Sequence, residues 1–270
     1  MFKAYIDNSG ILQAKYKDAQ QLNRYVFVVC TRGECKVSLY TSEYTLKENS
    51  IITLLPYKYF KVVEQQADTE LYVVTFDKRT FTSADVFETI IEHVAHIMES
   101  PFIDFPPTSI EIICDYIKVL MRMKEELLVG ENSDFVCSVL KQIIVIIGAR
   151  YNKLERVSQQ KDRSKALVFQ LTKHIAENYK SERSATFYAQ TMHVSPQHLA
   201  SVVKRVTNKT ITDIIAIFVM LYAQTKLAST DLSIGEIAAD LNFDDISVFG
   251  RYFKRYTKLS PRQYRTQNRV

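Results

Sequence analysis

The amino-acid sequence predicts an α+β protein of two domains, with an N-terminal antiparallel β-barrel or sandwich plus helices and a C-terminal all-α domain. Three observations predict this organisation. The 270 residues exceed the usual span of one hydrophobic core. Strand-like segments give way to helical periodicity near residue 80, and the net charge changes sign along the chain. A composition of 47% hydrophobic and 24% charged residues excludes an intrinsically disordered chain.

Short segments rich in β-branched and aromatic residues predict the strands of the N-terminal domain. They are YVFVVCT (25–31), CKVSLYT (35–41), IITLLP (51–56), YFKVVE (59–64) and LYVVTF (71–76). Segments of this length, separated by polar turns, are typical of an antiparallel sandwich or small barrel. We therefore expect a cup-shaped β-module in this part of the chain.

After Thr80 the apolar residues recur with a helical period. This pattern predicts helices over residues 84–98, 109–129 and 133–156. In the last of these, apolar side chains cover more of the circumference than packing against one sheet requires. The surplus is equally consistent with burial inside one subunit and with a homodimer interface.

A polar connector coincides with a change in charge. The stretch VSQQKDRS (157–164) contains few apolar residues, so we place a linker at residues 158–164, between a sensing or dimerisation domain (1–157) and a second domain (165–270). Residues 1–157 hold 18 basic and 21 acidic residues, a balance of −3, whereas residues 158–270 hold 17 and nine, a balance of +8. Such segregation is expected when one domain binds a polyanion. It favours nucleic acid as the partner over a chance asymmetry of a solvated surface.

Membrane and disulfide signals are weak in this sequence. The longest uninterrupted apolar run, residues 214–223, is half of the roughly 20 residues that a bilayer-spanning helix needs. Residues 1–10 do not resemble a secretory signal, so we expect a cytoplasmic protein with no membrane partner. The four cysteines form no CxxC motif, which predicts buried thiols, with a redox pair of Cys30 and Cys35 as the minor alternative.

One pattern occurs twice in the basic domain. The copies are FYAQTMHVSPQHLASVVKRVTNK (187–209) and IAADLNFDDISVFGRYFKRYTK (237–258), in which the second Lys-Arg pair follows the first at an offset of 50 residues. A short helix, a turn with an apolar anchor and a second helix form the layout of a helix-turn-helix unit. We therefore predict two such units, at residues 185–207 and 233–257, joined by a linking helix over residues 210–229.

The second helix of each predicted unit has an apolar face and a polar face. A major groove admits an α-helix whose outward N-terminal side chains reach base edges, while basic residues nearer its C-terminus meet phosphates. We assign base readout to Gln197, Ser201, Ile246, Ser247, Gly250 and Arg251. We assign phosphate contact to Lys204, Arg205, Lys254 and Arg255. Arg251 is the favoured guanine reader, because its fork can bond O6 and N7 together.

The linking helix has a length that suits double-stranded DNA. About 20 residues at about 1.5 Å each span roughly 30 Å, close to the roughly 34 Å between successive major-groove faces. One subunit can therefore read two grooves. A single outward Lys-Arg pair is more often a solvated surface, but two copies at matched positions in a basic domain favour DNA contact.

The most specific segment is IGEIAADLNFDDISVFGRYFKRYTKLSPRQYR (234–265), with its Phe-x-x-x-Phe-Lys core and its closing Ser-Pro-x-x-Tyr-Arg. With this segment, residues 165–265 resemble the DNA-binding domain of AraC/XylS-type bacterial transcription regulators. The resemblance implies a sequence-specific regulator that contacts RNA polymerase and carries a cupin-like, dimerising, ligand-sensing N-terminal domain. Asn208, Asn242 and Lys258 stand where that family usually has glycine.

The N-terminal module raises two further alternatives. An effector pocket would be lined by Arg24, Tyr25, Phe27, Tyr40, Tyr72 and Phe76. If these aromatic side chains only fill the hydrophobic core, the protein is a ligand-independent regulator.

A protein of another class, a small-molecule-binding protein or cupin-like enzyme whose basic helices serve another anion, is the competing hypothesis. Related folds hold a metal through strand histidines, but the first histidine here is His93, on a predicted helix. We therefore expect no metal, no cofactor and no catalytic residue.

Overall fold

The computed structural model describes residues 2–39, 42–56, 58–76, 89–90, 93–94, 96–97, 100–126, 134–158 and 163–268. The chain divides into two compact units, Met1–Tyr151 and Asn152–Val270. Antiparallel sheets build the first unit and helices build the second, so the predicted α+β class is confirmed in this general form.

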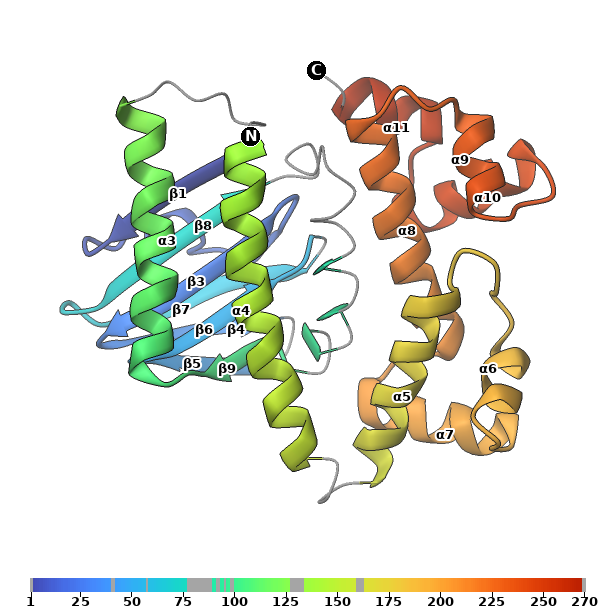
Figure 1. The fold of residues 1–270 in the computed structure, drawn as a ribbon, viewed down its shortest axis with the longest axis horizontal. Helices are drawn as coiled ribbons and strands as arrows, with labels where there is room; N and C mark the ends of the chain where they lie inside the picture. Colours follow the sequence, from blue (N-terminus) through green and yellow to red (C-terminus); the bar gives the residue numbers. More distant parts are fainter. Residues whose placement is uncertain are drawn as a thin grey trace. The chain divides into compact units, whose positions relative to one another are not determined.

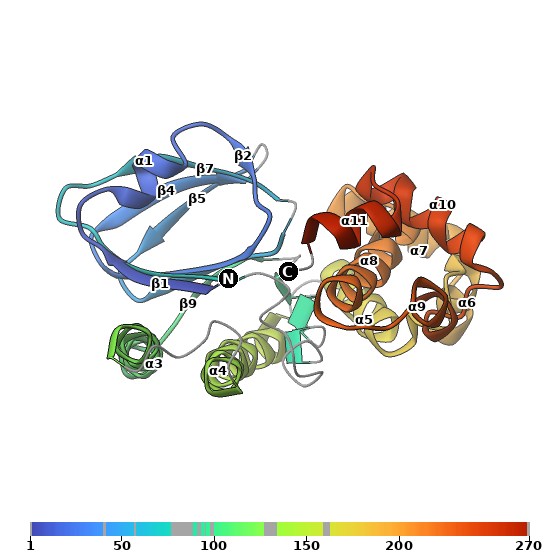
Figure 2. The same ribbon diagram turned by 90° about the horizontal axis from the view of Figure 1, so that it is seen from above.

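The N-terminal unit contains two antiparallel sheets (Figures 1 and 2). One has the strand order β1-β8-β3-β6-β9 and the other the order β2-β7-β4-β5. The strands are β1 (Phe2–Asp7), β2 (Gln20–Gln21), β3 (Tyr25–Arg32), β4 (Glu34–Leu39), β5 (Ser42–Lys47), β6 (Ser50–Leu54), β7 (Tyr59–Gln65), β8 (Glu70–Phe76) and β9 (Phe102–Asp104). The five segments expected from the sequence form β3, β4, β6, β7 and β8. The four strands that were not expected, β1, β2, β5 and β9, are the four sheet edges.

The space between the two sheets is filled by side chains. Alternation along β3 turns Val26 and Val28 toward the opposite sheet, where they join Val37 and Phe60 in one buried cluster. Gly33 permits the short connection from β3 to β4, because its φ is +75° and a Cβ there would lie 2.8 Å from the Thr69 Cα. The interior of the cup is therefore a packed core.

Two helices cover the outer face of the five-stranded sheet (Figure 2). They are α3 (Pro107–Glu126) and α4 (Asp134–Ser158); the short α1 (Ile11–Lys15) lies elsewhere in the unit, with its first amides bonded to the Asp7 carboxylate. The apolar surplus of α4 is largely used within the unit, since Ile143, Ile144 and Ile147 are buried. Most of the helix expected at 84–98 lies outside the described residues, but residues 89–90, 93–94 and 96–97 are helical.

The described residues of the C-terminal unit form helices joined by turns and short connections. Its helices are α5 (Arg163–Asn178), α6 (Ala185–Thr191), α7 (Pro196–Thr207), α8 (Ile211–Ser229), α9 (Ile234–Asp240), α10 (Ile246–Thr257) and α11 (Pro261–Asn268). Figure 1 shows α6 and α7 near one end of α8, and α9, α10 and α11 near the other. Residues 159–162 of the expected linker lie outside the described residues.

The central helix α8 is nearly all apolar. A capping box begins it, in which Thr210 Oγ1 accepts from the Asp213 amide and the Asp213 carboxylate accepts from the Thr210 amide. By length and composition α8 could cross a membrane, but 78% of its most apolar window is buried inside the unit. We interpret it as the core around which the other helices pack.

Gly148 of α4 packs closely against the side chain of His93. A Cβ at Gly148 would lie 1.9 Å from the His93 Nε2, so the buried imidazole would have to move. We expect Gly148→Ala to lower the free energy of unfolding of the N-terminal unit by about 1–3 kcal/mol, measured by urea denaturation. As a control, Gly250→Ala on α10 meets open space and should stabilise by about 0.5–1 kcal/mol. A Gly148→Ala protein as stable as the wild type would contradict this packing.

Candidate nucleic-acid interface

Two helix pairs of the C-terminal unit, α6–α7 and α9–α10, contain the same turn. In the first pair the Val194 amide donates to the Ala189 carbonyl at 3.0 Å, and in the second the Phe243 amide donates to the Ala238 carbonyl at 3.0 Å. His193 and Asn242, one residue earlier in each turn, have φ of 55° and 52°. Non-glycine residues adopt this left-handed conformation only where the surroundings require it. The sequence repeat is therefore a repeat of backbone geometry.

The second helix of each pair also ends in the same way. The Thr207 hydroxyl donates to the Val203 carbonyl at 2.8 Å, and the Thr257 hydroxyl donates to the Phe253 carbonyl at 2.9 Å. Each helix then closes on a left-handed residue, Asn208 in α7 and Lys258 in α10. The alignment at an offset of 50 residues thus holds for the helix ends as well.

The two helices begin with different caps. Ser195 caps α7 through its hydroxyl, followed by a proline at the first helical position. Asp245 caps α10, where its carboxylate accepts from the Ser247 and Val248 amides at 2.5 and 2.9 Å. Sequence reasoning missed the Asp245 cap, although an aspartate directly before an apolar-periodic segment is an ordinary start signal.

The inner faces of the pairs differ in size. Leu199 and Val203 are fully buried in the first pair, as are Phe249 and Phe253 in the second. In the second pair Phe243 adds ring contacts from the turn, at 5.3 Å to Phe249 and 5.4 Å to Tyr252. The second helix is therefore held by a cluster of aromatic rings.

The residues assigned to base readout lie on the outer face. Gln197, Ser201, Ser247 and Arg251 are exposed, and Ile246 is 50% exposed. Gly250 is half-buried, with open space where a side chain would point. These six positions lie within the first two turns of α7 or α10, which is the part of a reading helix that reaches base edges.

The residues assigned to phosphate contact are all exposed, but they differ in their internal contacts. The Lys204 ammonium donates to the Asn208 carbonyl at 3.1 Å, and Arg205 donates to the Ser164 hydroxyl at 3.0 Å. The Arg255 guanidinium lies 5.5 Å from the Tyr256 ring centroid. Lys254 is exposed on the same face of α10 as Arg251.

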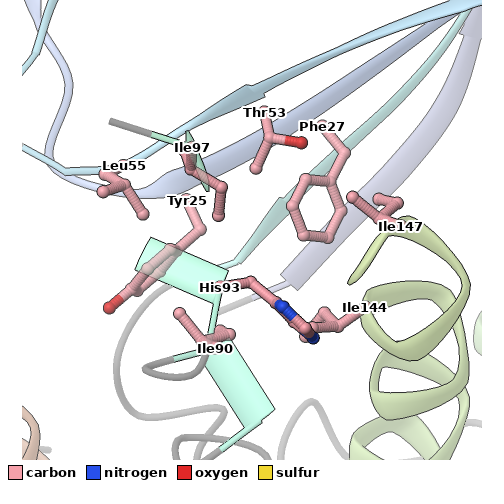
Figure 3. Close-up of a pocket in the computed structure, with 9 residues that line it drawn as sticks. All are labelled: Tyr25, Phe27, Thr53, Leu55, Ile90, His93, Ile97, Ile144 and Ile147. Carbon is pink, nitrogen blue, oxygen red and sulfur yellow. The ribbon is translucent and has the colours of Figure 1, made fainter. Parts of the chain in front are cut away.

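The residues suggested for an effector pocket separate in the structure. Tyr25 and Phe27 line a small apolar cavity of about 10 Å³ on the outer face of the five-stranded sheet, beneath α4 (Figure 3). Phe76 contacts both rings, whereas Tyr72 lies near Lys118 of α3.

Arg24 is half-buried just before Tyr25, and Tyr40 lies outside the described residues. The cavity has room for about one water molecule, and its other lining residues are Thr53, Leu55, Ile90, His93, Ile97, Ile144 and Ile147.

Neither metal-binding nor thiol chemistry is favoured by the described residues. Within them no group of three or more His, Cys, Asp or Glu side chains is placed to hold a metal ion. The four cysteines are buried, and none of them forms a disulfide within the described residues; burial raises the pKa of Cys30 to about 11 and that of Cys35 to about 12. Such thiols are poor nucleophiles.

Sequence comparisons support a DNA-binding role for the C-terminal unit. Residues 188–267 match the family model described as a helix-turn-helix domain. The Msm operon regulatory protein of Streptococcus mutans is 26% identical over 148 residues, which are 55% of this chain and 50% of that protein. The uncharacterized HTH-type transcriptional regulator YijO of Escherichia coli is 29% identical over 109 residues, 40% of this chain and 38% of that protein. The chain thus spans half or less of the length of these relatives.

Solved structures of transcription regulators are also similar. The C-terminal domain of AraT, a response regulator from Geobacillus stearothermophilus, is 26% identical and covers 40% of this chain and 91% of its own, with a TM-score of 0.38. ToxT from Vibrio cholerae is 12% identical and covers 99% of this chain and 98% of its own, with a TM-score of 0.44.

Carboxylates at three helix starts of the C-terminal unit couple its stability to pH. Hydrogen bonds from backbone amides or cap hydroxyls lower the pKa of Asp213, Glu236 and Asp245. A carboxyl group with a lowered pKa in the folded state stabilises above its unfolded pKa, and this stabilisation is lost as the pH falls through the folded value.

We therefore expect the melting temperature of the C-terminal unit to fall as the pH drops below about 4. Asp245→Asn keeps a cap acceptor but removes the titrating group. The wild type should melt higher than this variant at neutral pH, and the difference should shrink toward about pH 3. Thermal unfolding followed by circular dichroism measures this, and a difference independent of pH would contradict the role of the charged cap.

Proposed function

On the premise that residues 188–267 form an AraC-type helix-turn-helix domain, we propose that this protein is a transcription regulator in which each subunit reads two successive major grooves. The AraC-type resemblance inferred from residues 234–265 is confirmed by the family match and by relatives named as transcription regulators. DNA binding by the C-terminal unit is the general function. Two-groove reading, the contacts of single residues and the control of activity are the parts proposed here.

The duplicated backbone geometry carries the proposal of two reading units. The α6–α7 and α9–α10 pairs share the hydrogen bond across the turn, the left-handed residue in the turn and the left-handed residue after the second helix. Each second helix exposes polar and basic residues on the side away from its core. Two helix pairs with the same backbone geometry are expected to dock on DNA in the same orientation.

The spacing of the pairs supports reading along one face of DNA. The 19 residues of α8 span about 28 Å, somewhat less than the roughly 34 Å of one helical turn of DNA. Bending of the duplex toward the protein would shorten the distance between the grooves. We therefore propose that part of the specificity comes from the deformability of the site.

The second pair should contribute more of the base readout. Arg251 is exposed and can bond guanine O6 and N7 together, whereas Ala200 and Ser201 leave short side chains at the outer face of α7. The basic residues Lys254 and Arg255 would contact phosphate behind Arg251. Lys204 and Arg205 would do the same for the first pair on giving up their internal contacts.

For the N-terminal unit we propose control that does not require a ligand between the sheets. Its cupin-like cup is filled by the buried cluster of hydrophobic side chains. The cavity beneath α4 has room for about one water molecule, so a larger effector would enter only if the residues that line it moved apart. In this proposal the protein acts in the cytoplasm, where the DNA lies. Its effect on transcription is set by its abundance and by its contact with RNA polymerase. Stabilisation by a metabolite in a thermal-shift screen would instead support effector control.

The outer face of α3 is the proposed homodimer surface. Ile112 is 51% exposed and Val119 is 40% exposed, and with the half-buried Tyr116 and Met123 they form an apolar seam at the 3–4 spacing of paired helices. Glu111 lies beside one end of the seam and Arg122 beside the other.

An antiparallel pair of α3 helices from two subunits would match these charges. In that arrangement Ile112 faces Met123 across the axis, and Glu111 of one subunit lies near Arg122 of the other. A second copy of the chain therefore fits this face, whereas most of the apolar surplus of α4 is already buried.

Arg251 and Lys254 should respond differently to truncation. The probe is a duplex selected by the wild-type protein from a random-sequence pool, compared with an unselected duplex by fluorescence anisotropy. Arg251→Ala should weaken binding to the selected duplex by about 1–3 kcal/mol, or roughly five- to 150-fold, and spare the unselected one. Lys254→Ala should weaken both equally and reduce the salt slope by about 0.9.

Equal losses on both duplexes for Arg251→Ala would overturn the readout assignment. Failure of the wild-type protein to bind any duplex at low salt would favour the competing class, a small-molecule-binding protein or enzyme.

The dimer surface is tested by placing a charge in the seam. Val119→Lys would bury an unpaired ammonium group, which should raise the dimer dissociation constant by about 100-fold or more, measured by sedimentation. Val145→Lys, at a site 44% exposed on α4, is the matched control and should leave the dimer intact. Dissociation by Val145→Lys with an intact Val119→Lys dimer would place the interface on α4 instead.

A further inference from the structure

Arg183 joins the two halves of the C-terminal unit. It lies in the connection between α5 and α6, yet its guanidinium donates to the Leu241 carbonyl at 2.6 Å and to the Asn242 carbonyl at 2.5 Å. Its Cζ lies 4.1 Å from the ring centroid of Phe243. The two acceptor residues and Phe243 all lie in the turn between α9 and α10. A side chain from the first half therefore closes the turn of the second half.

The turn has a particular need for such a donor. Carbonyls at the C-terminal end of a helix lack intrahelical partners, and a cation there is favoured by the helix dipole. A guanidinium presents several donors in one plane, so it can serve both carbonyls while its face rests on Phe243. A lysine at position 183 keeps the charge but cannot reproduce the planar contact.

The contact continues from the turn into the reading helix. Phe243, under the Arg183 guanidinium, packs against Phe249 and Tyr252 of α10. Phe249 is buried on the side of α10 opposite Arg251, and Tyr252 is half-buried beside it. Fixing the Phe243 ring therefore fixes the rotation and position of the helix that presents Arg251.

A second set of contacts joins the same two segments. The Lys180 ammonium lies 3.6 Å from the Asp240 carboxylate and 4.4 Å from the Tyr222 ring centroid, and the Tyr222 hydroxyl donates to Asp240. Asn242 donates to the Ser181 carbonyl at 3.4 Å. Because Lys180 and Asp240 are partly exposed, their ion pair contributes little by itself, and the Arg183 contacts dominate.

The arginine is not part of the sequence repeat. Arg183 stands directly before Ser184, the N-cap of α6, and the corresponding residue before Ser233, the N-cap of α9, is Leu232. The arginine is therefore an addition to the repeated unit. Because it connects the first half of the unit to the turn of the second pair, it is placed to act on the relation between the pairs.

We propose that Arg183 is a positioning residue that holds α10 at a fixed place relative to the first helix pair and so sets the spacing between the two DNA half-sites. This inference rests on the proposed function, since it requires that both pairs bind one duplex. Loss of the Arg183 contacts leaves each pair folded but allows α9 and α10 to shift together on α8. The protein then tolerates half-site spacings that the wild type rejects.

The experiment compares half-site spacings. A duplex selected by the wild type is rebuilt with one to three base pairs inserted or deleted between its half-sites, and full-length protein is titrated against each duplex. The wild type should bind one spacing best. We expect Arg183→Leu and Arg183→Lys to reduce the preference for that spacing over its neighbours by about tenfold, the effect of losing one charged hydrogen bond. Arg262→Ala, an exposed arginine of α11, is the control for charge and should keep the wild-type preference.

The outcomes separate the inference from the proposed function. A wild-type protein that binds no duplex refutes the proposed function. A wild-type preference that both Arg183 variants retain overturns the positioning role, as does wild-type binding without any spacing preference. Arg183→Lys decides the result if Arg183→Leu fails to fold, which circular dichroism detects. A uniform loss of affinity at every spacing would indicate a purely structural role and also overturn the inference.

Discussion

Burial of α8 is the constraint on which the C-terminal unit depends. Fourteen of the 19 residues of α8 are buried, so other helices must cover α8 on nearly every side. The first helix pair packs near its start and the second near its end. The single helix α8 therefore holds the two helix pairs at a fixed distance from each other, as the proposed reading of two grooves requires.

The two helix pairs share their backbone geometry but differ in their side chains. The turn hydrogen bond and both left-handed positions are preserved, although the residues at those positions are His193 and Asn208 in one copy and Asn242 and Lys258 in the other. The inner residues are aliphatic in the first copy and aromatic in the second. On the outer face, Ser201 of the first copy corresponds to Arg251 of the second, and Gln197 corresponds to Ser247. The two copies therefore share their backbone geometry, whereas the side chains that we propose to contact DNA differ, which would let one subunit read two unlike half-sites.

Sequence patterns could predict the parts of the fold that depend on local periodicity. The interior strands β3, β6 and β8 are nearly continuous runs of apolar residues, and α7 and α10 have clear inner and outer faces, so their residues were identified correctly as strand and helix. The edge strands were missed because they pair on one side only and carry more polar residues; β5, for example, reads SEYTLK and is largely exposed. Alternation along β3 predicts that Val26 and Phe27 point to opposite faces of the sheet. It does not indicate which of these faces packs against the other sheet. The Arg183 contact joins residues 58 positions apart and has no periodic signature, so only the tertiary structure could identify it.

Methylation protection of guanine N7 on a duplex selected by the full-length protein tests the central claim most directly, because this atom lies in the major groove. The account predicts two clusters of protected guanines per subunit, about 10 base pairs apart on one face of the duplex. A single protected cluster per subunit, or two clusters on opposite faces, would contradict the account.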